Sequence, residues 1–134
     1  MYKTFQPVNP ANKADAISRV SGIMPGGLTN ISGAMSLALD QRAENTAANI
    51  IVFLTDGFPT AGQTFWPSIR DTVQRENDQN YAIFSLAIGS SAPYADMERM
   101  STMNNGIARQ IFDGQEVTSQ IQGFYDGVAS PVVW

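Results

Sequence analysis

The chain carries two uninterrupted runs of apolar residues, and each has the length of a β-strand. The first run, NIIVFL, covers residues 49–54, and the second, YAIFSLAIG, covers residues 81–89. Continuous runs rich in β-branched residues are typical of parallel strands that are buried on both faces. The shorter segment IARQIF at 107–112 predicts a third strand, and the loose alternation of YKTFQPV at 2–8 predicts a short edge strand.

Amphipathic segments separate these strands. Asn9 can cap a helix that Pro10 begins, and apolar residues then recur at helical spacing. A closing helix has an apolar face of the same kind, and Asn-Asn-Gly at the end of the helix before it is good C-terminal cap chemistry. The helices are expected within residues 9–24, 31–43, 65–79, 92–106 and 117–133, with apolar faces at Ala14, Ile17, Val20 and Ile23 in the first and at Val117, Ile121, Phe124 and Val128 in the last.

This alternation of strands and helices predicts an α/β fold. The expected architecture is a doubly wound, mostly parallel sheet with helices on both faces, because right-handed crossovers place successive helices there. With 134 residues and no internal repeat or linker, the chain is expected to form one domain.

Three residues lie at the carboxyl ends of the predicted strands. They are Asp56, Gly89 and Asp113. In open α/β sheets, ligands bind outside the carboxyl ends of the strands, so Asp56 is expected to point into a binding crevice. Thr29, in the loop PGGLTN before a predicted helix, could meet it there.

A hydroxyl and a carboxylate at one sheet edge can ligate a small hard cation such as Mg²⁺. A purely structural explanation is also open. Thr29, Asn30 or Ser32 could cap the helix that follows, and Asp56 could cap the next turn.

Composition and charge narrow the function classes. The net charge is -4 and basic residues are isolated, which argues against nucleic acid as a partner. The absence of cysteine and histidine excludes thiolate zinc sites, disulfides and Ser-His or Cys-His catalysis. No apolar run approaches the roughly 18 residues that a transmembrane helix needs.

Several segments resemble the von Willebrand factor A domain. IIVFLTDGFPTAGQT resembles the fourth strand of that family and the loop after it, and GGLTNISGAM resembles its second metal-site loop. NNGIARQIF and QIQGFYDGVASPVV resemble the last strand and helix of the version found in inter-alpha-trypsin inhibitor heavy chains. The similarity runs from about Tyr2 to Val133. It implies an extracellular, non-enzymatic, protein-binding domain.

In that family a metal-ion-dependent adhesion site binds Mg²⁺ through three loops. The first contains Asp-x-Ser-x-Ser, the second a Thr and the third an Asp. Thr29 matches the second loop and Asp56 the third, but the first loop has no counterpart here. The resemblance therefore implies that residues 1–134 are a partial A domain, from about the third strand to the C-terminal helix, without the first two strands of the family fold. Met1 is accordingly expected to be an internal methionine of a longer protein.

The missing first strand would lie beside residues 49–54 in the centre of the sheet. We therefore expect the rest of the parent protein, or another chain, to complete the sheet. By the same reasoning Mg²⁺, or Mn²⁺ or Ca²⁺ in its place, is expected to bind well only when the missing first metal loop is supplied.

The partner implied by the resemblance is a protein ligand that offers a carboxylate, with the extracellular matrix as one source. Its contacts are expected on a rim around Thr29 and Asp56. Phe65 and Trp66 could instead pack on the helix that follows them. Asn30-Ile31-Ser32 also matches the N-glycosylation pattern, and we interpret that match as chance. The predicted rim residues are Asn30, Gly57, Phe58, Phe65 and Trp66.

Two other functions stay open. One is a metal-independent structural domain of a larger secreted protein. The other is a Mg²⁺-dependent phosphohydrolase with Asp56 as nucleophile, which is less well supported. That chemistry usually needs a second acid two residues later and a nearby lysine, whereas position 58 is Phe and the nearest basic residue after Asp56 is Arg70.

Overall fold

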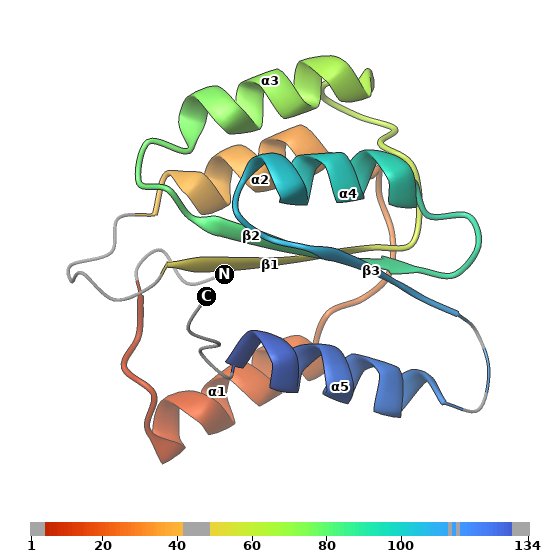
Figure 1. Ribbon diagram of the computed structural model, residues 1–134. Helices are drawn as coiled ribbons and strands as arrows, with labels where there is room; N and C mark the ends of the chain where they lie inside the picture. Colours follow the sequence, from red (N-terminus) through yellow and green to blue (C-terminus); the bar gives the residue numbers. More distant parts are fainter. Residues whose placement is uncertain (1–4, 42–48, 113, 115, 130–134) are drawn as a thin grey trace.

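The computed structural model describes residues 5–41, 49–112, 114 and 116–129. Helices and strands alternate from the second helix onward (Figure 1). None of the helices in these residues is long and apolar enough to cross a membrane. The elements are α1 (Pro10–Ser21), α2 (Ile31–Leu39), β1 (Ile50–Thr55), α3 (Trp66–Glu76), β2 (Ala82–Ile88), α4 (Tyr94–Met103), β3 (Ala108–Ile111) and α5 (Val117–Ala129).

The described strands form one parallel sheet of three, in the order β1-β2-β3. Ile50 pairs with Ala82, and Ser85 pairs with Ala108. Helices α2, α3 and α4 lie on one side of the sheet, and α1 and α5 lie on the other (Figure 1). The predicted α/β fold with helices on both faces is confirmed. The predicted strand at 2–8 is wrong for residues 5–8, which form no strand; residues 1–4 lie outside the described residues.

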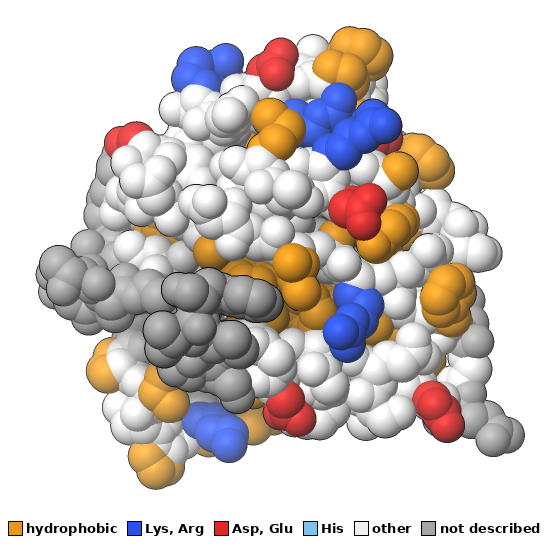
Figure 2. Space-filling view, in the orientation of Figure 1, with side chains coloured by type: hydrophobic (Ala, Val, Ile, Leu, Met, Phe, Trp, Pro, Cys, Tyr) orange, Lys and Arg blue, Asp and Glu red, His pale blue; other side chains and the backbone are white. Residues whose placement is uncertain are grey.

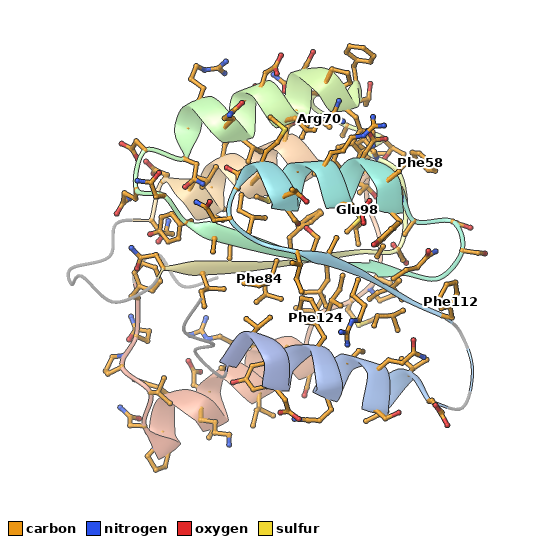
Figure 3. The ribbon with its side chains drawn as sticks, in the orientation of Figure 1. Phe58, Arg70, Phe84, Glu98, Phe112 and Phe124 are labelled. Carbon is orange, nitrogen blue, oxygen red and sulfur yellow. The ribbon has the colours of Figure 1, made fainter. Side chains whose placement is uncertain are left out.

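A separate core lies on each face of the sheet. The larger core fills the space between the sheet and α2, α3 and α4, with Met35, Ile69 and Met97 among its members. In the smaller core Phe124 of α5 contacts Phe84 of β2 edge to face, with ring centroids 6.4 Å apart (Figure 3). The predicted apolar face of the last helix is confirmed, because Val117, Ile121 and Val128 pack against this core.

Helix α1 forms as predicted but does not pack as predicted. Asn9 caps it, accepting a hydrogen bond from the backbone N–H of Asn12 at 2.8 Å. No residue of α1 is buried, and Ile17 and Val20 are 58% and 67% exposed. A helix with an uncovered apolar stripe gains little burial energy, so its stability comes mainly from its caps and local hydrogen bonds.

Strand β1 corrects a second expectation. Burial on both faces was predicted, yet Ile50, Val52 and Leu54 are 40–48% exposed and alternate with half-buried Ile51 and Phe53. The reason is its place at the edge of the sheet that the described residues form. Hydrophobic side chains are visible at the level of the sheet, between the upper and lower helices (Figure 2).

The backbone of β1 shows which groups face outward. The N–H of Ala82 donates to the carbonyl of Asn49 at 2.9 Å, so the odd-numbered residues of β1 bond to β2. Successive residues of a strand direct their backbone groups to opposite sides. The N–H and C=O groups of Ile50, Val52 and Leu54 therefore point away from β2.

Candidate functional site

The parallel strands bring the predicted site residues to one edge of the sheet. Asp56 follows β1 directly, and Gly89 follows β2 with a positive φ of 76° that turns the chain sharply. Asp113, which follows β3, lies outside the described residues. The expectation that strand ends converge at a common edge is confirmed for the first two strands.

Two loops join at this edge through Thr29 and Thr60. The N–H of Thr29 donates to the hydroxyl oxygen of Thr60 at 2.8 Å. In return, the N–H groups of Thr60 and Ala61 donate to the Thr29 carbonyl at 2.9 and 3.1 Å. Thr29 is thereby anchored to the loop that begins at Asp56. Sequence reasoning missed Thr60, because no sequence signal pairs a loop hydroxyl with a backbone group 31 residues away.

Asn30 caps α2. Its Oδ1 accepts hydrogen bonds from the N–H of Gly33 at 2.9 Å and from the hydroxyl of Ser32 at 3.2 Å. The Ser32 hydroxyl oxygen accepts a hydrogen bond from the N–H of Gln63 at 3.0 Å, which also joins the first turn of α2 to the loop after β1. A Cβ at Gly62 would lie 2.3 Å from Asn30 Oδ1, so this approach requires glycine. The capping explanation therefore applies to Asn30.

The Asp56 side chain has a different environment. It is exposed and makes no hydrogen bond or ion pair with any described residue. The following turn is closed by Thr55 instead, whose hydroxyl donates to the carbonyl of Gly57 at 3.1 Å. Capping of that turn thus does not account for Asp56.

The donors available for a cation are few. Thr29 is half-buried and Asp56 is exposed, and both stand on loops at the same edge. Within the described ranges, no group of three or more acidic side chains is arranged to hold a metal ion. Hydroxyl and carboxylate oxygens suit a hard cation by type, but two side chains are too few for the near-octahedral geometry that Mg²⁺ demands.

The predicted rim divides into exposed and buried members. Phe58 and Phe65 are 59% and 67% exposed. Gly57, which lies between Asp56 and Phe58 in sequence, is half-buried. Trp66 is only 6% exposed and belongs to the larger core. For Trp66 the expectation of an exposed rim residue is wrong, because the first turn of α3 directs it toward the sheet. Its buried Nε1 has no hydrogen-bond partner in the described structure.

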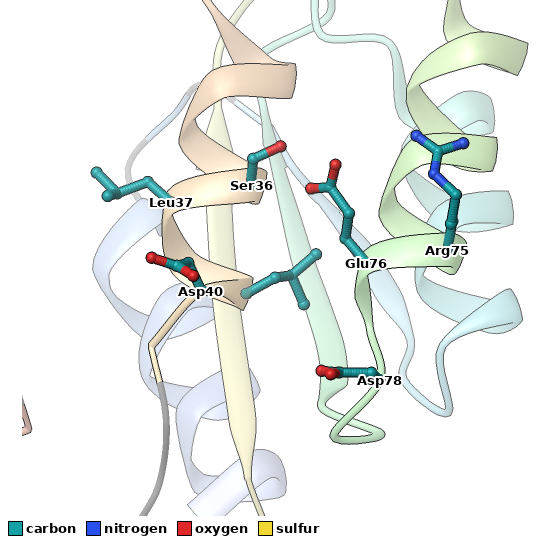
Figure 4. A pocket seen from close by; sticks show the side chains of 7 residues that line it. Ser36, Leu37, Asp40, Arg75, Glu76 and Asp78 are labelled. Carbon is teal, nitrogen blue, oxygen red and sulfur yellow. The ribbon is translucent and has the colours of Figure 1, made fainter.

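A cavity of about 590 Å³ lies between α2 and α3, at the end of each helix remote from this edge (Figure 4). It is lined by Ser36, Leu37, Leu39, Asp40, Arg75, Glu76 and Asp78. Helix α2 begins at Ile31, beside Thr29, and the first of its residues to line the cavity is Ser36, more than one helical turn further along. The cavity is not part of that site.

Comparison with known proteins agrees with this architecture. The sequence model of the von Willebrand factor type A domain family matches residues 2–126 of this chain. Inter-alpha-trypsin inhibitor heavy chain H4 of Homo sapiens is 33% identical over 95% of this chain, and heavy chain H2 of Mus musculus is 33% identical over 90%. Heavy chain H3 of Mesocricetus auratus is 30% identical over 92%.

The chain spans only 14–15% of the length of these relatives. The similarity thus concerns one domain of much larger proteins. The matched residues include the parallel sheet, the loop with Thr29, and β1 with Asp56 directly after it. The chain belongs to the von Willebrand factor type A domain family and is related to the inter-alpha-trypsin inhibitor heavy chains.

Proposed function

We propose that this chain is the protein-binding part of an extracellular A domain and that its ligand docks at the edge marked by Asp56. The observation that carries the proposal is the exposed Asp56 carboxylate without a described partner, beside a loop pair anchored through Thr29 and Thr60. A carboxylate held without a partner on a fixed framework is suited to interacting with something outside the chain.

The proposed cofactor is Mg²⁺, with Mn²⁺ or Ca²⁺ as substitutes. Thr29 and Asp56 would supply one hydroxyl and one carboxylate oxygen. When bound, the ion would supply a Lewis-acidic position that a carboxylate of the ligand protein can occupy. Because the described chain offers only these two matched donors, tight binding of the ion requires oxygen ligands from elsewhere in the parent protein or from another chain.

Phe58 and Phe65 would contact the ligand protein. Both are exposed aromatic side chains, and such residues contribute strongly to binding when a partner covers them. Trp66, the residue after Phe65, packs into the core and would hold this segment of the chain in place.

The same geometry argues against catalysis. A phosphohydrolase would need a cation near Asp56 to neutralise the transferred phosphoryl group. Arg70, the nearest basic residue after Asp56 in sequence, is instead paired with Asp96 at 2.6 Å. We propose that the domain is not an enzyme.

The edge of β1 is the proposed site where another segment completes the sheet. The backbone groups of Ile50, Val52 and Leu54 face away from β2, and their side chains are half exposed. A further strand would satisfy these groups and cover apolar surface that the described residues leave open.

The proposal can be tested by titrating Mn²⁺ into the ¹⁵N-labelled chain and following paramagnetic broadening of backbone NMR signals. We expect broadening centred on Thr29 and Asp56, with an affinity on the order of millimolar or weaker. Asp56→Asn should abolish it, and Asp71→Asn, which changes an acidic residue of α3, should not.

Other outcomes separate the alternatives. Broadening elsewhere, or an equal effect in the Asp56→Asn variant, would favour the metal-independent structural domain. Tight, Asp56-dependent binding by the chain alone would show that the two side chains suffice, contrary to the expected need for further ligands.

A further inference from the structure

A second recessed surface lies on the outer side of the molecule, between α3 and α4. It encloses about 510 Å³ and is lined by Arg70, Glu98, Arg99, Thr102 and Met103. We call it the α3–α4 groove. Arginine side chains gather over these helices beside hydrophobic ones (Figure 2), and Arg70 and Glu98 lie on the same side of the sheet (Figure 3).

Arg70 is held in place before any ligand arrives. Its Nη1 donates to Asp96 Oδ1 at 2.6 Å, and its side chain is only 14% exposed. Asp96 belongs to the first turn of α4, so the ion pair joins the two helices that form the groove. A guanidinium that is already ordered loses less conformational freedom when it donates another hydrogen bond.

Arg99 carries the charge that nothing in the described structure neutralises. Its side chain is exposed and makes no hydrogen bond or ion pair with a described residue. The neighbouring acid, Glu98, is engaged by the hydroxyl of Tyr94, which donates to its Oε1 at 2.8 Å. Glu98 is therefore held toward the preceding turn of α4.

The charges of the groove indicate which ligand it fits. Arg70 and Asp96 form an ion pair, so their charges cancel. Glu98 keeps its negative charge, but its Oε1 already accepts the Tyr94 hydroxyl, and Arg99 is left as the basic side chain of the lining that has no described partner. A carboxylate brings one negative charge and can accept two hydrogen bonds from a guanidinium. A phosphate dianion would bring a second negative charge close to Glu98. Met103, which is 44% exposed, offers an apolar contact beside the charge.

We propose that the α3–α4 groove binds an acidic side chain of a partner protein, with the carboxylate on Arg99 and Arg70 and an adjacent apolar residue on Met103. This contact involves neither Thr29 nor Asp56. It stands independently of the metal-dependent contact proposed above and would hold a partner on a different face of the domain.

The test is an NMR titration of the ¹⁵N-labelled chain with the blocked dipeptide acetyl-Glu-Leu-amide. We expect saturable shifts of the Thr102 and Met103 amides and of the Arg99 side-chain signal. Acetyl-Gln-Leu-amide and acetyl-Lys-Leu-amide should bind at least about tenfold more weakly, because they lack the charge-assisted hydrogen bonds. Inorganic phosphate should also bind more weakly than the Glu dipeptide.

Variants assign the effect to the groove. Arg99→Gln should weaken binding about tenfold. Arg75→Gln, which changes an arginine of α3 that donates to Thr72 outside the groove, should leave it unchanged, and so should Asp56→Ala. The proposal is overturned if the Glu and Gln dipeptides bind alike, if phosphate binds more tightly, or if Arg99→Gln binds as the parent chain does.

Discussion

Thr29 and Thr60 are bonded to each other in both directions across the edge of the sheet. The Thr29 N–H donates to the Thr60 hydroxyl oxygen at 2.8 Å, and the Thr60 N–H donates to the Thr29 carbonyl at 2.9 Å. One loop leads into α2 and the other leaves β1, so this pair sets how Thr29 stands relative to the strand that ends at Asp56. Any ligand that uses both loops depends on it.

Removing the Thr60 hydroxyl should loosen this connection. We expect Thr60→Ala to lower the free energy of unfolding by about 1 kcal/mol, the net value of one hydrogen bond, and to speed hydrogen exchange at the Thr29 amide. Urea denaturation and exchange measured by NMR check both effects. Thr60→Ser keeps the hydroxyl and should resemble the parent chain; equal loss in the Ser variant would point to the methyl group instead.

Gly106 packs so closely on β2 that no side chain fits. A Cβ there would lie 1.9 Å from the carbonyl oxygen of Ile83. Gly106→Ala should therefore lower the free energy of unfolding by about 3 kcal/mol, as overpacking does. Gly123→Ala is the matched control, since a Cβ at this exposed position of α5 meets nothing within 4 Å and should stabilise by about 0.5–1 kcal/mol. Thermal unfolding of both variants measures the predicted loss and gain of stability.

Ser85 and Ser101 form a fully buried pair. Both are 0% exposed, and the Ser101 hydroxyl donates to Ser85 Oγ at 2.8 Å. Ser85→Ala should cost about 1–3 kcal/mol, because it leaves a buried hydroxyl without its partner. The double variant with Ser101→Ala should cost less than the sum of the single ones. A double-mutant cycle measures this coupling, and strict additivity would contradict it.

Tyr94 should make stability depend on pH in the alkaline range. The hydrogen bond to Glu98 is the largest cause that raises the pKa of Tyr94 above 10.0, followed by desolvation and the charge of Glu98. The unfolded state thus loses this proton more readily than the folded state. The resulting stabilisation is complete below pH 10.0 and is lost as pH rises through the folded pKa.

Denaturation on both sides of this pH, with tyrosinate absorbance as a second probe, tests the expectation. Tyr94→Phe should remove part of the alkaline loss of stability. Tyr125→Phe, which alters an exposed tyrosine of α5, should keep it. A parent-like profile for Tyr94→Phe would contradict the assignment to Tyr94.

Val52 lies in the middle of the side of β1 that the described residues leave uncovered, and it is 43% exposed. A lysine at an edge strand opposes pairing with further strands, so Val52→Lys should reduce concentration-dependent association of the chain. Sedimentation velocity over a range of concentrations measures this. Thr64→Lys adds the same charge at an exposed loop position and should have a smaller effect; equal effects would mean that net charge alone is responsible.

Much of the fold could be predicted from sequence, because strands and helices are encoded in short periodic patterns. The run before Asp56 predicts β1, and the spacing of Val117, Ile121 and Phe124 predicts the face of α5 that packs on the sheet. The position of Asp56 at a strand end follows from the same local pattern.

Burial could not be predicted in this way, since it depends on which segments are neighbours in space. Ile17 and Val20 have the spacing of a packed helix face, but no described strand lies against them. Phe65 and Trp66 are adjacent aromatic residues, and only the direction of the first turn of α3 leaves one exposed and buries the other.

The sequence by itself determined the alternation of strands and helices, the parallel sheet and the place of Asp56 at its edge. Only the tertiary structure decided that β1 is an edge strand of the sheet formed by the described residues, that Thr60 holds Thr29, and that Arg70 pairs with Asp96, 26 residues away. The physical reason is that the spacing of apolar residues reflects the local geometry of a single helix or strand. Strand pairing and burial instead depend on contacts between segments that are distant in sequence.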